Sequence, residues 1–131
     1  MQATGSFTVK ITPQSEDKGD GSTLGRMLLE KLFTGDLEAQ GEGEMLTAGT
    51  DTKGSTVYVA VERVTGILNG RSGSFALHHR GIMTQGVPEL QISVVPDSGT
   101  VELLGISGTL AIKIEAGQHF YVLDYTLPEA G

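Results

Sequence analysis

The chain has 131 residues and a net charge of −7, with 19 glycines and no cysteine. This length suits one domain with its own core, so residues 1–131 are expected to form a single domain. The composition excludes disulfide bonds and thiolate metal sites, and the negative charge argues against nucleic acid or anionic membrane as a partner.

No targeting or cofactor signal stands out along the chain. No segment approaches the roughly 20 apolar residues that span a bilayer, and the first residues, MQATGSFTVKI, lack the basic and apolar regions of a signal peptide. The sequence contains no Walker A motif, no G-x-S-x-G and no H-E-x-x-H. We therefore expect a cytoplasmic protein with no membrane partner and no cofactor.

The N-terminal segment predicts a strand followed by a loop. Phe7, Val9 and Ile11 alternate with polar residues, which is typical of a strand with one apolar face. The segment 13–22, PQSEDKGDGS, is polar and contains glycine, so we expect an exposed loop there.

The next segments are less clear. The apolar positions within Leu24–Phe33 fit either a helix or a strand. Gly35-Asp36 interrupts this pattern, and the three glycines at 41, 43 and 49 indicate a twisted or bulged strand from Leu37 to Ala48.

The remainder of the chain predicts strands joined by short turns. The expected strands are Val57–Thr65, Gly70–Met83, Leu90–Val95, Val101–Ile114 and His119–Leu127. About eight strands without a confident long helix indicate an all-β fold. An antiparallel sheet of this size closes into a barrel or splits into a sandwich.

The Asn69-Gly70 turn fixes a register between two strands. This dipeptide favours a type I′ hairpin, in which Glu62 pairs with Leu77 and Ala60 with His79. Paired residues share a face, so Glu62 and His79 lie on the apolar, inner face as diagonal neighbours, roughly 7–8 Å apart at Cα. Tyr58 shares that face.

A second hairpin adds two residues to the interior. With a turn at Ala116-Gly117, Ile114 pairs with His119 and Ile112 with Tyr121, on a strongly apolar face. The candidate site is therefore an interior cluster of ligand-binding residues: Glu62, His79, Tyr58, Tyr121 and His119. The carboxylate and imidazole suit acid–base chemistry, or Glu62 is a buried group with a partner. A metal site is not expected, because the spacing of Glu62, His79 and His119 matches no known pattern.

Two short motifs have simple structural explanations. Asp97-Ser98-Gly99-Thr100 spells an aspartic-protease motif, but Pro96 before it favours an ordinary turn between strands. The run Asp17–Gly21 has the wrong ligand spacing for an EF-hand and favours a solvated loop. Three valines, Val57, Val59 and Val61, lie on the outer face of their strand. Such a strip packs under a loop or forms a subunit contact, and we favour the contact and hence a homo-oligomer.

Short motifs along nearly the whole chain resemble a bacterial family of domains of unknown function. The motifs are Gly35-Asp36-Leu37, Tyr58-Val59-Ala60, Glu62–Gly66, Gly70-Arg71, Gly73–Phe75, His79 with Gly81, Val95-Pro96, Ser98–Thr100, Glu102-Leu103, Gly105-Ile106, Gly108, His119, Tyr121 and Leu123–Tyr125. This family is similar in fold to allene oxide cyclase, a closed antiparallel eight-stranded barrel of lipocalin-like architecture. The resemblance implies that Leu24–Phe33 is a strand, and it supplies no established reaction.

Three functions follow as hypotheses. The first is a barrel that binds a small apolar ligand, which meets Glu62, His79 and Tyr121 inside. The second is an isomerase or cyclase-like enzyme in which Glu62 and His79 transfer protons, by analogy of fold with allene oxide cyclase. The third is a barrel filled by side chains that acts as a structural or interaction protein. Whether the protein is an enzyme stays open at this point.

Overall fold

Eight antiparallel strands form a closed barrel in which each strand pairs with its neighbours in the sequence and β8 pairs with β1. The computed structural model describes residues 1–128. The strands are β1 (Gln2–Lys18), β2 (Ser22–Gly35), β3 (Leu37–Thr50), β4 (Thr56–Leu68), β5 (Arg71–Thr84), β6 (Val87–Val94), β7 (Ser107–Glu115) and β8 (Gln118–Thr126), with a 3₁₀ turn, η1 (Val101–Leu103), between β6 and β7. The prediction of an all-β barrel of about eight strands is therefore confirmed.

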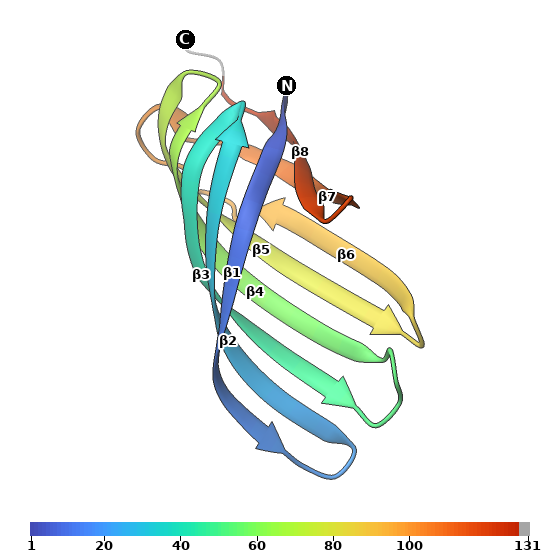
Figure 1. Ribbon diagram of the computed structural model, residues 1–131. Coiled ribbons are helices and arrows are strands. Elements are labelled where there is room, and N and C mark those ends of the chain that lie inside the picture. The colour runs from blue at the N-terminus through green and yellow to red at the C-terminus, as the bar shows by residue number, and fades with distance from the viewer. Residues whose placement is uncertain (129–131) are drawn as a thin grey trace.

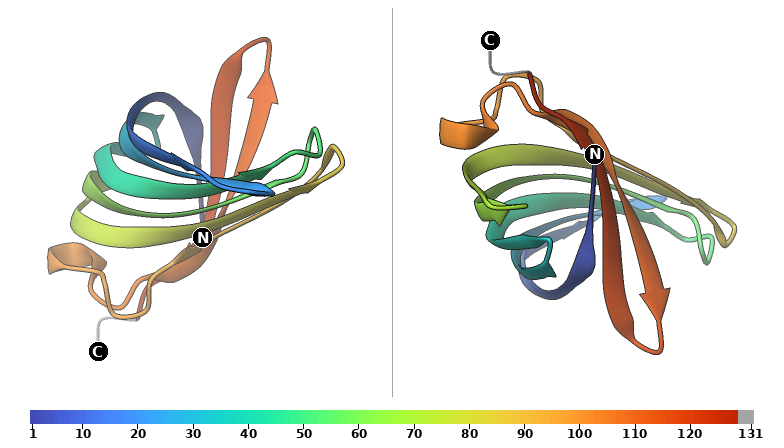
Figure 2. Two further views of the ribbon diagram at one scale, coloured as in Figure 1. Left: turned by 90° about the horizontal axis from the view of Figure 1, so that it is seen from below. Right: turned by 90° about the horizontal axis from the view of Figure 1, so that it is seen from above.

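The barrel closes at one end only. β8 pairs with β1 over Gln2–Phe7, and β6 meets β7 at the single pair Ser93–Thr109. The long strands β1–β5 and most of β6 continue beyond this ring as a curved wall, as Figure 1 shows. In both views of Figure 2 the β7–β8 hairpin projects away from that wall. The molecule thus has a closed end, near the N-terminus, and an open end.

Side chains fill the interior of the closed end. Phe7 packs on Phe33 with ring centroids 5.5 Å apart, and Tyr121 meets Phe33 edge to face at 5.6 Å. Phe75, Leu77 and the other inward residues of the core are almost fully buried. Because these side chains alternate with exposed ones along each strand, the fold follows from the period-2 pattern of the sequence.

The structure confirms both registers that were predicted from the turns. Ala60 pairs with His79 and Glu62 with Leu77. In the last hairpin, Ile112 pairs with Tyr121, and Ile114 pairs with His119. The ambiguous segment Leu24–Phe33 is a strand, as the family resemblance implied.

Two predicted elements were wrong. The expected loop at 13–22 is strand as far as Lys18, because β1 and β2 stay paired up to Lys18–Thr23. The expected strand Val101–Ile114 begins only at Ser107. Its first residues form η1 and a turn, in which Val101 adopts a φ of 55° that a strand cannot accommodate.

The segment Asp97–Thr100 is a turn, as predicted. The Ser98 hydroxyl donates to the carbonyl of Val95 (2.7 Å) and accepts from the Ala76 amide (3.0 Å), so it ties the connection to β5. In the part of the chain that the structure describes, no helix is long and apolar enough to cross a membrane.

Candidate ligand site

Three ionisable side chains meet inside the barrel, where closed and open ends join. Oε1 of Glu62 accepts a hydrogen bond from Nζ of Lys31 at 3.0 Å and lies 2.7 Å from Nε2 of His79. All three side chains are buried, with exposed fractions of 6 % for Lys31, 0 % for Glu62 and 3 % for His79. The cluster is therefore a buried, hydrogen-bonded network around one carboxylate oxygen, which we call the Lys31–Glu62–His79 triad.

Strand register and small residues make room for the triad. Lys31 pairs with Gly41, and Glu62 pairs with Gly43. A Cβ atom at Gly41 would lie 3.0 Å from Oε2 of Glu62, tighter than ordinary contact. Gly41 thus leaves the space that the carboxylate occupies, whereas Gly43 allows the backbone of β4 at Val61 and Glu62 to approach closely.

The charge on Glu62 is set by opposing effects. Burial alone would raise the pKa of the carboxyl, but the hydrogen bond to His79 and the charge of Lys31 outweigh it, so the pKa lies below its ordinary value. The carboxylate is therefore ionised near neutral pH, and His79 donates its Nε2 proton to it. Lys31 also lies over the ring of Phe7, 5.1 Å from the centroid.

One carboxylate oxygen has no partner. Among residues 1–128, Oε2 of Glu62 is the buried side-chain oxygen that forms no hydrogen bond. Burial of an unpaired charged oxygen is costly, so the site holds a polar atom that the fold itself does not satisfy.

Tyr58 connects the triad with the open end. Its ring lies directly over Gly81, where a Cβ atom would come within 2.0 Å of Cε1. Burial, and secondarily the negative charge of Glu62, raise the pKa of the Tyr58 phenol. The hydroxyl is therefore protonated at neutral pH and able to donate a hydrogen bond.

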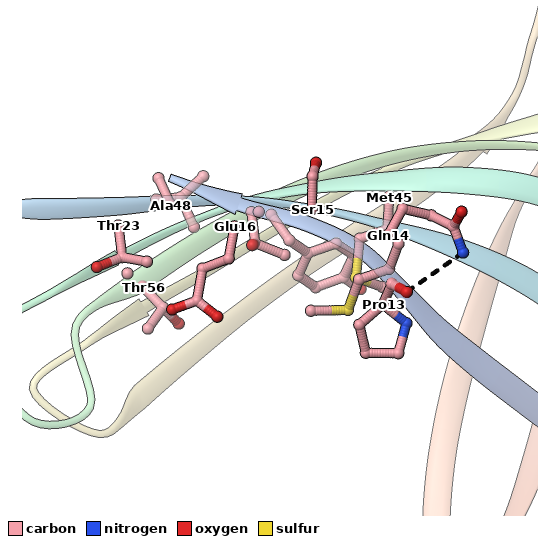
Figure 3. Close-up of a pocket in the computed structure, with 14 residues that line it drawn as sticks. Pro13, Gln14, Ser15, Glu16, Thr23, Met45, Ala48 and Thr56 are labelled. Carbon is pink, nitrogen blue, oxygen red and sulfur yellow. Dashed lines mark hydrogen bonds between the residues drawn. The ribbon is translucent and has the colours of Figure 1, made fainter. Parts of the chain in front are cut away.

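A pocket of about 650 Å³ lies on the inner side of the wall at the open end. Figure 3 shows its lining: the apolar side chains of Met45 and Pro13 lie together, and Glu16 and Thr56 lie beside each other at some distance from them. Met27, Met45 and Tyr58 stand at its inner end, and Thr23, Thr47 and Thr56 contribute hydroxyl groups. Its volume is in the range of pockets that hold small ligands.

The pocket and the triad are neighbours in the register of the sheet. Met27, Met45, Ala60 and His79 occupy directly paired positions across β2, β3, β4 and β5. Tyr58 lies one pair farther toward the open end, opposite Thr47 and Gly81. The triad is therefore behind the inner end of the pocket and does not line it.

The structure brings together only some of the predicted site residues. Glu62 and His79 are in contact, and Tyr58 is close enough for the Glu62 charge to affect its phenol. Tyr121 belongs to the packed core, where its hydroxyl donates to the Thr34 carbonyl and accepts from the Leu37 amide, both at 2.9 Å. His119 packs against Phe7 with the two rings tilted by 44°, and it lines a different hollow, of about 370 Å³, beside the β7–β8 turn.

Several site residues were missed in the sequence analysis: Lys31 of the triad, and pocket residues that include Met27, Met45 and Glu16. Lys31 lies between Leu29 and Phe33, two inward residues of β2, but the apolar spacing of this segment fits helix and strand alike and so did not assign Lys31 to a face. Met27 and Met45 were missed because the pocket exists only where the strands curve beyond the closed end of the barrel. Local sequence patterns do not encode that curvature. Within residues 1–128 no three His, Cys, Asp or Glu side chains are grouped to hold a metal ion.

Comparisons with known proteins give a relative of the same fold and a family, both described as of unknown function. The structure is similar to the crystal structure of a protein of unknown function from Shewanella oneidensis MR-1, a DUF3224 family member, with a TM-score of 0.93 and 52 % sequence identity. The match covers 99 % of this chain and 98 % of the other. No curated protein matches the chain. Residues 3–125 match the model of a family described as protein of unknown function, DUF3224. The chain therefore belongs to the DUF3224 family.

Proposed function

We propose that this protein binds a small apolar molecule in the pocket at the open end of the barrel. The observation that carries the proposal is the pocket itself, about 650 Å³ in volume, with Met27, Met45 and the Tyr58 ring around its inner end. Apolar walls with a few polar groups are typical of sites that bind small molecules.

Tyr58 supplies a polar contact for such a ligand. Its hydroxyl takes part in no hydrogen bond within residues 1–128, whereas the Tyr121 hydroxyl is fully used by the backbone. A half-buried phenol with a free hydroxyl fits a ligand oxygen or nitrogen.

Gly49 provides a sharp test of the pocket. This residue lines the pocket, and a Cβ atom there would meet nothing within 4 Å, so a large side chain fills the pocket without displacing the backbone. We expect Gly49→Phe to weaken binding of the neutral fluorescent probe N-phenyl-1-naphthylamine at least tenfold in a titration.

The matched control is Thr65→Phe, which adds the same ring at an exposed position on the outer face of β4. This variant should bind the probe like the wild-type protein. Equal binding by wild type and Gly49→Phe, or no binding by the wild type, would refute the proposal.

A second candidate function is proton transfer by an isomerase or cyclase-like enzyme. The 2.7 Å contact between Glu62 and His79 favours it, because a carboxylate that orients an imidazole is a common acid–base arrangement. Against it, Glu62 also binds Lys31, and no member of the triad lines the pocket. The resemblance to allene oxide cyclase that the sequence motifs imply is an analogy of fold, which by itself carries little weight for a reaction.

The two candidate functions predict different effects of Glu62→Gln on binding and on turnover. If the protein only binds its ligand, the probe affinity should change little in a variant that remains folded. If the protein is an enzyme, the variant should lose turnover while it retains binding.

A further inference from the structure

The charged residues around the open-end pocket are unevenly distributed. Its lining includes one carboxylate, Glu16, and no lysine, arginine or histidine. The whole chain carries a net charge of −7. A pocket with this lining disfavours an anionic ligand, because no positive group would compensate for the lost hydration of the anion.

Glu16 faces the pocket because of a β-bulge. Before the bulge, Pro13 pairs with the inward residue Met27; beyond it, Ser15 pairs with Arg26 and Glu16 with Gly25. The extra residue shifts the alternation by one, so even-numbered residues of β1 now point inward. Without the bulge the Glu16 side chain would lie on the outer face. Bulges commonly redirect a side chain next to a binding site.

The Glu16 carboxylate forms only a weak ion pair within the protein and is available to a ligand. Its nearest cation is Lys18, 3.9 Å away, and the Lys18 side chain is 81 % exposed. Ion pairs between exposed groups contribute little, so a ligand can compete for Glu16. Gly25, opposite Glu16, leaves space beside it.

The inner end of the pocket suits an apolar group. Lys31 donates a hydrogen bond to Glu62 at 3.0 Å, so the two charges balance there. The Tyr58 ring, Met27 and Met45 line this end of the pocket.

We propose that the pocket selects an apolar amine in its protonated form, with the ammonium group at Glu16 and the apolar body against Met27, Met45 and Tyr58. This inference rests on the proposed function, because it specifies the ligand of the same pocket. It assigns the bulge in β1 a role in ligand selection.

Three probes that share one apolar body test this inference: 1-naphthylmethylamine, 1-naphthalenemethanol and 1-naphthoic acid. In calorimetric titrations at pH 7, we expect the amine to bind about fivefold more tightly than the alcohol, and the acid to bind least. Glu16→Gln should remove the advantage of the amine and leave the alcohol unchanged. Asp17→Asn is the matched control, since Asp17 pairs with Leu24 on the outer face.

The outcomes separate the two proposals. If amine and alcohol bind equally, if the acid binds best, or if Glu16→Gln and Asp17→Asn weaken the amine alike, the amine inference is overturned. In those cases loss of all binding in Gly49→Phe would still support the pocket. If no probe binds the wild-type protein, or Gly49→Phe binds all three as well as wild type, the proposed function fails instead.

Discussion

At the scale of residues, the Lys31–Glu62–His79 triad is the most unusual feature of the core. Burying charges costs free energy that their mutual attraction offsets only when the geometry is good. Here one oxygen of Glu62 binds both partners, while Oε2 has none. The triad is therefore sensitive to the loss of any single member.

Removal of Glu62 alone should destabilise the protein strongly. Glu62→Leu leaves the Lys31 ammonium buried without its partner, which we expect to lower the free energy of unfolding by about 3–5 kcal/mol. The double variant Glu62→Leu/Lys31→Met removes both charges and should recover part of this loss. Urea unfolding measures both variants.

The control is the exposed pair of Arg26 and Glu44, whose side chains are about half exposed. Glu44→Gln should change the free energy of unfolding by less than about 1 kcal/mol. A double variant no more stable than Glu62→Leu would contradict the view that an unpaired charge is the main cost.

The triad should also make stability depend on pH. The pKa of Glu62 is lower in the folded protein than its ordinary value of 4.5, so the unfolded state binds more protons between these values. The stabilisation is present above about pH 4.5 and is lost as the pH falls through the folded-state pKa. Wild type should therefore lose stability more steeply in acid than Glu62→Gln in urea titrations at several pH values. Parallel curves would argue against this assignment.

At the scale of elements, the β2–β3 turn is held by a residue from the other end of the chain. Tyr121 of β8 bridges the Thr34 carbonyl and the Leu37 amide through its hydroxyl. Gly5, next to this hydroxyl, has no room for a side chain, since a Cβ atom would lie 2.7 Å from it. The Tyr121 hydroxyl oxygen thus links β8 to β2 and β3 within the closed end.

Tyr121→Phe should therefore cost about 1–3 kcal/mol in the free energy of unfolding, because it leaves buried backbone groups unpaired. Tyr125→Phe is the comparison, since the Tyr125 hydroxyl only accepts from the side chain of Asn69, which is exposed and can bind water instead. Equal losses in thermal or urea unfolding would show that the bridge contributes nothing specific.

The two unpaired strand edges at the open end contain features that disfavour pairing with another chain. β1 beyond Phe7 pairs only with β2, and most of β6 pairs only with β5. Pro13 and the bulge interrupt the first edge, and Pro88 interrupts the second. Proline lacks an amide donor, so these residues disfavour pairing with another chain along the edges.

At the scale of the whole molecule, the outer face of the wall is notably apolar. Val57, Val59 and Val61 are 41 %, 45 % and 59 % exposed, and the paired strand adds Leu46, which is 54 % exposed. The predicted homo-oligomer would cover this strip. We expect native mass spectrometry to detect an oligomer that Val59→Lys shifts toward monomer, while Thr65→Lys on the same strand does not. A monomer at all concentrations would contradict the prediction.

Local sequence patterns were enough to predict much of the fold and part of the site. Asn69-Gly70 and Ala116-Gly117 adopt positive φ angles, as their turn types require, and this chemistry fixed both registers. The inward pairing of Glu62 and His79 follows from the first of them. In contrast, Lys31 was missed because apolar spacing in its segment fits helix and strand alike.

The sequence by itself determined the class of fold, the strand registers next to glycine turns and the proximity of Glu62 to His79, because these depend on residues close together along the chain. Only the tertiary structure decided that the barrel closes at one end, that Tyr121 and His119 lie apart from the triad, and that a bulge turns Glu16 toward an open pocket. These features depend on where β8 stops pairing with β1 and on how the wall curves beyond that point. Such long-range geometry arises from the packing of all strands together, and no local periodic pattern of the sequence encodes it.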